Sequence, residues 1–166
     1  MSQMTEAQIN ATPLTAEAFA KFGDVICMGA APDKIINQGK CERYHDLAEL
    51  AFTKTGRAGI SLFNATPRKL PYQLGMMERH PLGSQAFLPL HEYPFLVVVA
   101  EDDNGKPKNV RAFITPPSIG VNYHRNIWHG VLTPLEAPGL FAVVDRIGKD
   151  KNLEEFWFDQ NIIIEK

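Results

Sequence analysis

Short runs of apolar residues alternate with polar turns along most of this chain. Residues 95–100, FLVVVA, form a continuous and mostly β-branched run, which is typical of a strand buried on both faces. Residues 140–144 repeat this pattern, and residues 59–65 alternate in the manner of a half-buried strand. Polar turns separate the runs, as at residues 101–108. Many short strands with almost no helix predict an all-β sandwich or barrel.

One short segment has the pattern of a helix. Thr15 can cap a helix over residues 16–22, and Gly23 can end it. Phe19 and Phe22 are three positions apart and would share one face of that helix. We therefore expect a short N-terminal helix that packs on the barrel or serves as a lid.

The composition is that of an ordinary soluble globular domain. Of 166 residues, 45% are apolar and 22% are charged, which favours a single domain over residues 1–166, with residues 1–12 flexible because they lack an apolar pattern. The formal net charge of −2 provides no basic field, so we expect neither nucleic acid nor a membrane as a partner. No apolar run approaches the ~20 residues of a membrane span, and the start lacks the regions of a signal peptide. We expect a cytoplasmic protein.

The end of the chain carries a short apolar run at residues 162–164, III. In a monomer this run and the open strand edges of a barrel would be left bare. The sequence therefore predicts a homodimer.

A polar stretch at residues 77–90 precedes the longest apolar run. Successive side chains of a strand alternate between faces, so Glu78 and His80 would project together. Residues 81–84, PLGS, have the composition of a turn, after which Gln85 can return beside the pair. The stretch thus predicts a carboxylate, an imidazole and an amide on one surface.

These side chains fit the template of an open metal site loosely. Such a site needs a few His and carboxylate ligands from different strands, with a position left for water or substrate. The candidate ligands are Glu78, His80 and His129, with Gln85 close by. A Glu-x-His pair also occurs on solvated sheet faces, and a histidine beside Trp128 can be a hydrogen-bonded core residue. Two polar clusters in an otherwise apolar barrel favour the metal site.

A second polar cluster suits an anionic substrate. Tyr123 and Arg125 flank His124, and a guanidinium can bind a carboxylate through two hydrogen bonds. Arg43, in the polar segment at residues 41–48, permits the same interpretation. A surface salt bridge explains either arginine equally well. No nucleophile elbow surrounds the only candidate serine of this region, and no H-E-x-x-H or phosphate-binding glycine loop occurs.

Several longer phrases together resemble the ureidoglycolate lyase family of allantoin breakdown. They are ERYHDLA at 42–48, MERHPLGSQAFLPL at 77–90, FLVVVA at 95–100, RAFITPPSIGVNYHRNIWH at 111–129 and VVDR at 143–146. The resemblance implies a cupin-like β-barrel of the jelly-roll type, a homodimer, and cleavage of (S)-ureidoglycolate to glyoxylate and urea in purine nitrogen salvage. It also implies a divalent metal ion, with nickel as the first candidate.

The cupin pattern assigns positions to the candidate ligands. Glu78, His80 and Gln85 occupy positions of the first cupin motif, and His129 occupies that of the second-motif histidine. Two of the usual ligand positions therefore hold Glu and Gln in place of His and Glu. Two other functions stay open: a cupin module that binds a small carboxylate without turnover, and a metal-dependent oxygenase.

Roles follow from the chemistry of the implied substrate, which carries a hydroxyl and a ureido nitrogen on one carbon. The candidate catalytic residues are Glu78, His80 and His124, of which Glu78 or His124 would move the proton. Arg43 is the first candidate for the substrate carboxylate, and Arg125 is the second. Tyr123 and Gln85 complete the predicted substrate-binding set.

Overall fold

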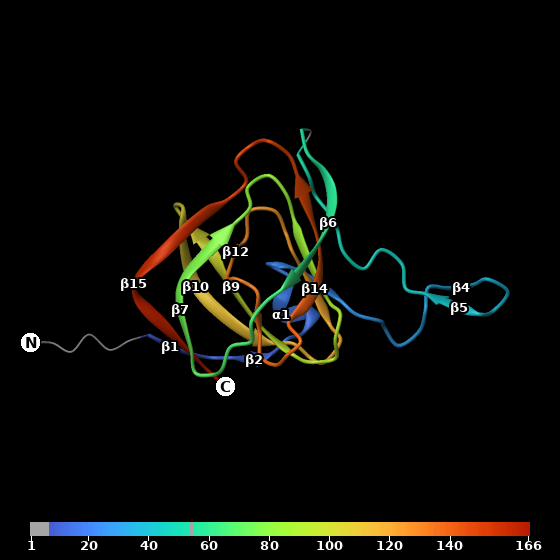
Figure 1. The fold of residues 1–166 in the computed structure, drawn as a ribbon, viewed down its shortest axis with the longest axis horizontal. Coiled ribbons are helices and arrows are strands. Elements are labelled where there is room, and N and C mark those ends of the chain that lie inside the picture. The colour runs from blue at the N-terminus through green and yellow to red at the C-terminus, as the bar shows by residue number, and fades with distance from the viewer. Residues whose placement is uncertain (1–6, 54) are drawn as a thin grey trace, which may run out of the picture.

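Two β-sheets packed face to face build the computed structural model, which describes residues 7–53 and 55–166 (Figure 1). The larger sheet has eight strands in the order β1 (Gln8–Asn10), β15 (Glu154–Glu165), β7 (Tyr72–Arg79), β12 (Trp128–His129), β9 (Phe95–Asp103), β10 (Lys106–Ile114) and β2 (Thr12–Pro13), with β13 (Thr133–Pro134) beside β9. The smaller sheet has five, in the order β3 (Gly23–Ile26), β11 (Gly120–Tyr123), β8 (Gln85–Pro89), β14 (Leu140–Ile147) and β6 (Arg57–Asn64). The fold is an almost entirely β, nearly closed barrel, as the sequence predicts.

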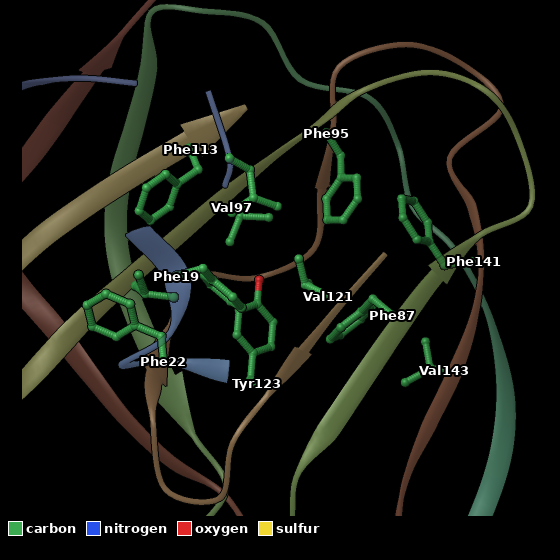
Figure 2. Packing of buried hydrophobic residues seen from close by; sticks show 12 residues of the cluster. Phe19, Phe22, Phe87, Phe95, Val97, Phe113, Val121, Tyr123, Phe141 and Val143 are labelled. Carbon is green, nitrogen blue, oxygen red and sulfur yellow. The ribbon is translucent and has the colours of Figure 1, made fainter. Parts of the chain in front are cut away.

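Strand β9 lies between two apolar cores, because its alternate side chains are apolar on both faces. Phe95, Val97 and Val99 face the smaller sheet, where they pack with aromatic residues such as Phe87 and Phe141 (Figure 2). Each fully buried side chain of this size contributes about 1.5–3 kcal/mol to stability. The run at residues 95–100 is therefore buried on both sides, as predicted.

The second core lies on the other side of β9, where the larger sheet curls on itself. Leu96 and Val98 pack there with Leu74, Trp128 and Ile164. Ile164 belongs to β15 and is fully buried, since β15 pairs with both β7 and β1. The expectation that the isoleucine run at 162–164 would be bare is therefore wrong.

The predicted helix is present but shorter than expected. Helix α1 (Ala16–Phe19) begins after Thr15, whose Oγ1 accepts a hydrogen bond from the backbone N–H of Ala18 at 3.2 Å. It ends at Phe19, and Phe22 reaches the core from the following turn. Among the described residues, no helix is long and apolar enough to span a membrane.

Regular structure begins inside the N-terminal segment that was expected to be flexible. Strand β1 pairs in parallel with β15, and β2 pairs in parallel with β10. Residues 1–6 lie outside the described residues. A third element, the hairpin of β4 (Lys34–Ile36) and β5 (Cys41–Arg43), forms a two-stranded sheet of its own and stands off the barrel (Figure 1). We call this hairpin with its flanking residues, 28–47, the arm.

Candidate metal centre

Three potential metal ligands converge between the two sheets. Glu78 of β7 lies directly opposite His129 of β12 in the antiparallel register, so both side chains project from the same face. His80 follows two positions after Glu78. One ligand atom from each of the three lies within 4.8 Å of the others. The structure thus brings together the three residues that the sequence singled out as metal ligands.

Backbone carbonyl groups fix the orientation of both imidazoles. His80 Nδ1 lies 2.8 Å from the carbonyl oxygen of Asn152, and His129 Nδ1 lies 3.0 Å from that of Gly130. A carbonyl oxygen can only accept a hydrogen bond, so each Nδ1 carries a hydrogen, and Nε2 is the ring nitrogen left to bind a ligand. Both Nε2 atoms are buried and have no hydrogen-bond partner among the described residues. This is the arrangement in which histidines bind a metal ion.

The protonation states of the site suit a divalent cation. Burial, together with the neighbouring His80, lowers the pKa of His129 to about 3, so this imidazole is neutral near pH 7. Burial raises the pKa of Glu78, the nearby Glu155 raises it further, and His80 opposes them. The neutral imidazole of His129, the imidazole of His80 and the carboxylate of Glu78 together form a donor set that Zn²⁺, Ni²⁺ and similar ions accept.

Tyr123 of β11 supports His129 from the smaller sheet. The two rings are stacked, with centroids 4.3 Å apart and planes 4° apart. Tyr123 is buried in the core between the sheets (Figure 2), and this burial raises the pKa of its hydroxyl, as does Glu78. The phenol therefore stays protonated, and its ring holds the imidazole in place.

Gln85 of β8 presents a third unpartnered atom near this site. It lies beside Tyr123 in the register of the smaller sheet, and Asp145 of β14 lies on its other side. Its Nε2 donates a hydrogen bond to Asp145 Oδ2 at 3.2 Å, whereas its buried Oε1 has no partner among the described residues. Asp145 thereby fixes the amide with its oxygen directed away from the carboxylate.

The other predicted residues do not join the cluster within one chain. His124 Nε2 lies 3.0 Å from Asp24 Oδ2, on the outer face of the smaller sheet. Arg125 is exposed in the turn that follows. Arg43 lies on the arm, where its Nη2 donates to His45 Nδ1 at 2.8 Å.

A groove leads along β7 and β15 to the cluster. It has a volume of about 450 Å³ and reaches the site at Glu78. Its lining comprises Arg68, Tyr72, Gln73, Gly75, Met76, Glu78, Val131, Glu155 and Trp157. A groove of this volume can admit a small polar molecule. Its charged lining residues are Arg68, Glu78 and Glu155.

Comparison with known proteins agrees with the geometry. A model of the ureidoglycolate lyase family matches residues 6–165. The chain belongs to this family. It is 60% identical over 153 residues to the ureidoglycolate lyase of Rhodobacter capsulatus, covering 92% of this chain and 95% of that protein. It is 57% identical to the ureidoglycolate lyase of Mesorhizobium japonicum, with 91% and 93% covered, and 51% identical to that of a Chelativorans species, with 92% and 93% covered. The resemblance seen in the sequence is confirmed.

In this member of the ureidoglycolate lyase family, three residues that contact the candidate site could not be predicted from the sequence. Asn152 lies in a loop whose carbonyl orients His80, Asp145 orients Gln85, and Glu155 pairs with Glu78 across β15 and β7. The motif VVDR contains Asp145, but its role depends on a strand register that the local pattern does not reveal. For Asn152 and Glu155 the sequence carries no comparable signal.

Proposed function

We propose that this protein is a ureidoglycolate lyase that cleaves (S)-ureidoglycolate into glyoxylate and urea in allantoin and purine catabolism. Membership of the family supports the reaction. The observation that carries it in the structure is the partly buried cluster of Glu78, His80 and His129, in which two buried imidazole Nε2 atoms have no hydrogen-bond partner among the described residues. An unpartnered buried polar atom costs about 1–3 kcal/mol, and two such atoms beside a carboxylate within ligand reach of one another support a bound ion.

A divalent ion at this cluster is the first part of the proposal, and nickel is the first candidate. His80 and His129 would hold it through Nε2, and Glu78 through one carboxylate oxygen. When bound, such an ion acts as a Lewis acid that lowers the pKa of a substrate hydroxyl. The orphaned Gln85 Oε1 can accept a hydrogen bond from the substrate nearby.

The protein residues move one proton during the reaction. Loss of the substrate hydroxyl proton lets a carbonyl form while the C–N bond breaks, and that bond's electron pair leaves with the ureido nitrogen. The same proton then completes urea, so no water is consumed. Glu78 is suited to carry the proton, because its raised pKa brings it closer to neutral pH and its second oxygen can act as the base. His124 is the alternative base, although it contacts Asp24 on the outer face.

The substrate carboxylate requires a cationic partner if it is to leave water. Arg43 remains our first candidate and Arg125 the second, with Tyr123 supporting His129 behind the substrate. We also propose a homodimer, since Ile60 and Leu62 of β6 are 78% and 68% exposed. A cytoplasmic location and the absence of nucleic acid and membrane partners stay predictions from the sequence.

The direct test is stoichiometry. Purified protein loaded with nickel is incubated with (S)-ureidoglycolate, and glyoxylate, urea and ammonia are measured. We expect equal amounts of glyoxylate and urea and no ammonia. Two equivalents of ammonia per glyoxylate would indicate an amidohydrolase, oxygen uptake would indicate an oxygenase, and binding without turnover would indicate a carboxylate-binding module; each overturns the proposal.

A further inference from the structure

The arm stands off the barrel of its own chain (Figure 1). Its strands β4 and β5 have three residues each and pair only with one another. An isolated two-stranded hairpin is marginally stable at best in water. Apolar side chains nevertheless face solvent along the arm: Met28 is 73% exposed and Ile35 59%. Such an element is expected to pack against another surface.

The arm presents a cation with a fixed orientation. Arg43 Nη2 lies 2.8 Å from His45 Nδ1, and a guanidinium can only donate, so Nδ1 accepts and Nε2 carries the hydrogen. Asp33 holds this pair in place, because its carboxylate accepts from the His45 backbone N–H at 2.8 Å and its own N–H donates to the Arg43 carbonyl at 2.9 Å. Arg43 has no ion-pair partner in the part of the chain that the structure describes. A guanidinium and an imidazole N–H together suit a carboxylate.

The groove beside the metal centre has the complementary character. Glu78 and Glu155 lie opposite each other there and raise the local negative charge. Met76 and Trp157, which is 67% exposed, provide an apolar wall. In Figure 1 the arm projects beyond β6, whereas β7 and β15 lie on the opposite side of the barrel, so the arm cannot reach the groove of its own chain.

We propose that the arm of one copy lies in the groove of a second copy, where Arg43 and His45 bind the substrate carboxylate. Ile35 and Met28 would then cover the apolar wall, and Arg43 would offset the paired carboxylates. The active site would be complete only in the dimer. This inference rests on the proposed lyase function and adds the assembly that the function requires.

Two heterodimers with opposite expected results test the inference. In the first, one chain carries Arg43→Ala and the other His129→Ala, each with a different affinity tag. If the arm acts across the dimer, one site receives an intact arm and an intact cluster, so about half of the wild-type activity remains. If Arg43 acts within its own chain, both sites are defective and activity is lost.

In the second heterodimer, one chain carries both substitutions and the other is wild type. The wild-type cluster then receives the defective arm, so we expect loss of activity; action within one chain would leave about half. Arg68→Ala paired with His129→Ala is the matched control, because Arg68 lines the groove of its own chain.

Each result decides between the two arrangements. The reversed pattern, or a fully active monomer, would overturn the inference while leaving the lyase function intact. Wild-type homodimers without ureidoglycolate turnover would overturn both. Arg43→Ala homodimers should also show an increased KM, which His45→Ala should share to a smaller degree; unchanged KM values in both would exclude a role in carboxylate binding.

Discussion

The position of the hydrogen on each imidazole determines which ring nitrogen of His80 and His129 can bind a metal ion. Because the carbonyls of Asn152 and Gly130 accept the Nδ1 hydrogens, His80 and His129 are left with Nε2 as the ligand atom. We predict that His80→Ala and His129→Ala each lower metal affinity and kcat by at least ~10²-fold. Metal competition titration and glyoxylate release measure the two quantities. His91→Gln, a histidine outside the cluster, is the control, and normal metal affinity in either alanine variant would contradict the ligand role.

The buried His129 makes the metal-free protein sensitive to acid. Its pKa is about 3 in the folded chain against an ordinary value of 6.5, so the unfolded chain binds more protons between these pH values. The free energy of unfolding should therefore fall as the pH is lowered through this window, by up to about 1.4 kcal/mol per pH unit. Urea titrations of chelator-treated protein measure it.

A matched variant isolates this contribution to the pH dependence. His129→Gln removes the titrating group from the buried site. The free energy of unfolding should then fall less steeply between pH 6 and pH 4, with a slope smaller by that of about one proton. Lys34→Gln, on the exposed arm, should leave the curve unchanged. An equally steep decline in His129→Gln would assign the acid sensitivity to other groups.

Asp145 determines which end of the Gln85 amide faces away from β14. Asp145→Asn replaces one of the two acceptor oxygens with an NH₂ donor, so the Gln85 amide can turn to accept from it and lose its present oxygen position. We predict a rise in KM of about tenfold, the value of one hydrogen bond of ~1.4 kcal/mol. Combining Asp145→Asn with Gln85→Glu should recover much of this loss, since a carboxylate accepts from either side. No recovery would mean that Asp145 acts by another route.

Contacts between residues of distant strands could not be predicted from the sequence, because they depend on how those strands pair. Glu78 and His80 could be placed on one face from their spacing, because alternation is local. His129 meets them only because the two-residue strand β12 pairs at Glu78, and this pairing has no local signature. His124 is adjacent to Tyr123, so alternation places the two side chains on opposite faces of the smaller sheet, and a shared role in one substrate site stays a prediction.

Among the elements, the helix depends on its cap more than on its length. Helix α1 spans Ala16–Phe19, too short to be stable alone, and it places the fully buried Phe19 in the core. Thr15→Ala removes the hydrogen bond to the Ala18 N–H and should lower the free energy of unfolding by about 1 kcal/mol. Thr12→Ala, at another exposed threonine, should have a smaller effect. Equal losses in both variants would argue against capping.

The strands were easier to predict than their partners. Apolar runs identified β9, β14 and β6, since burial on one or two faces leaves a visible period. The short strands β1 and β2 escaped, because their order comes from parallel pairing with β15 and β10 and not from their own composition. The run at 162–164 was apolar for the same reason as β9: it lies against a core formed by distant strands.

At the scale of the whole molecule, the outer face of the smaller sheet exposes large apolar side chains. Ile60 and Leu62 of β6 lie opposite Val144 and Ala142 of β14 on that face. The edge strand β6 carries no proline or charge between Ala58 and Asn64, the usual means by which edges avoid pairing. A second copy packed on this face would bury these side chains.

Ile60→Glu should therefore dissociate the dimer. Ile60 is 78% exposed in one chain, so the substitution should change the stability of a monomer by only about 0.5 kcal/mol, whereas a carboxylate buried in an interface costs several kcal/mol. We expect the wild-type protein to sediment at twice the chain mass of 18.6 kDa and Ile60→Glu to sediment at that mass. Asn10→Glu adds the same charge on β1 of the larger sheet and should leave the dimer intact. If Ile60→Glu stays dimeric while Asn10→Glu dissociates, the interface lies on the larger sheet, and the arm must reach its partner from that side.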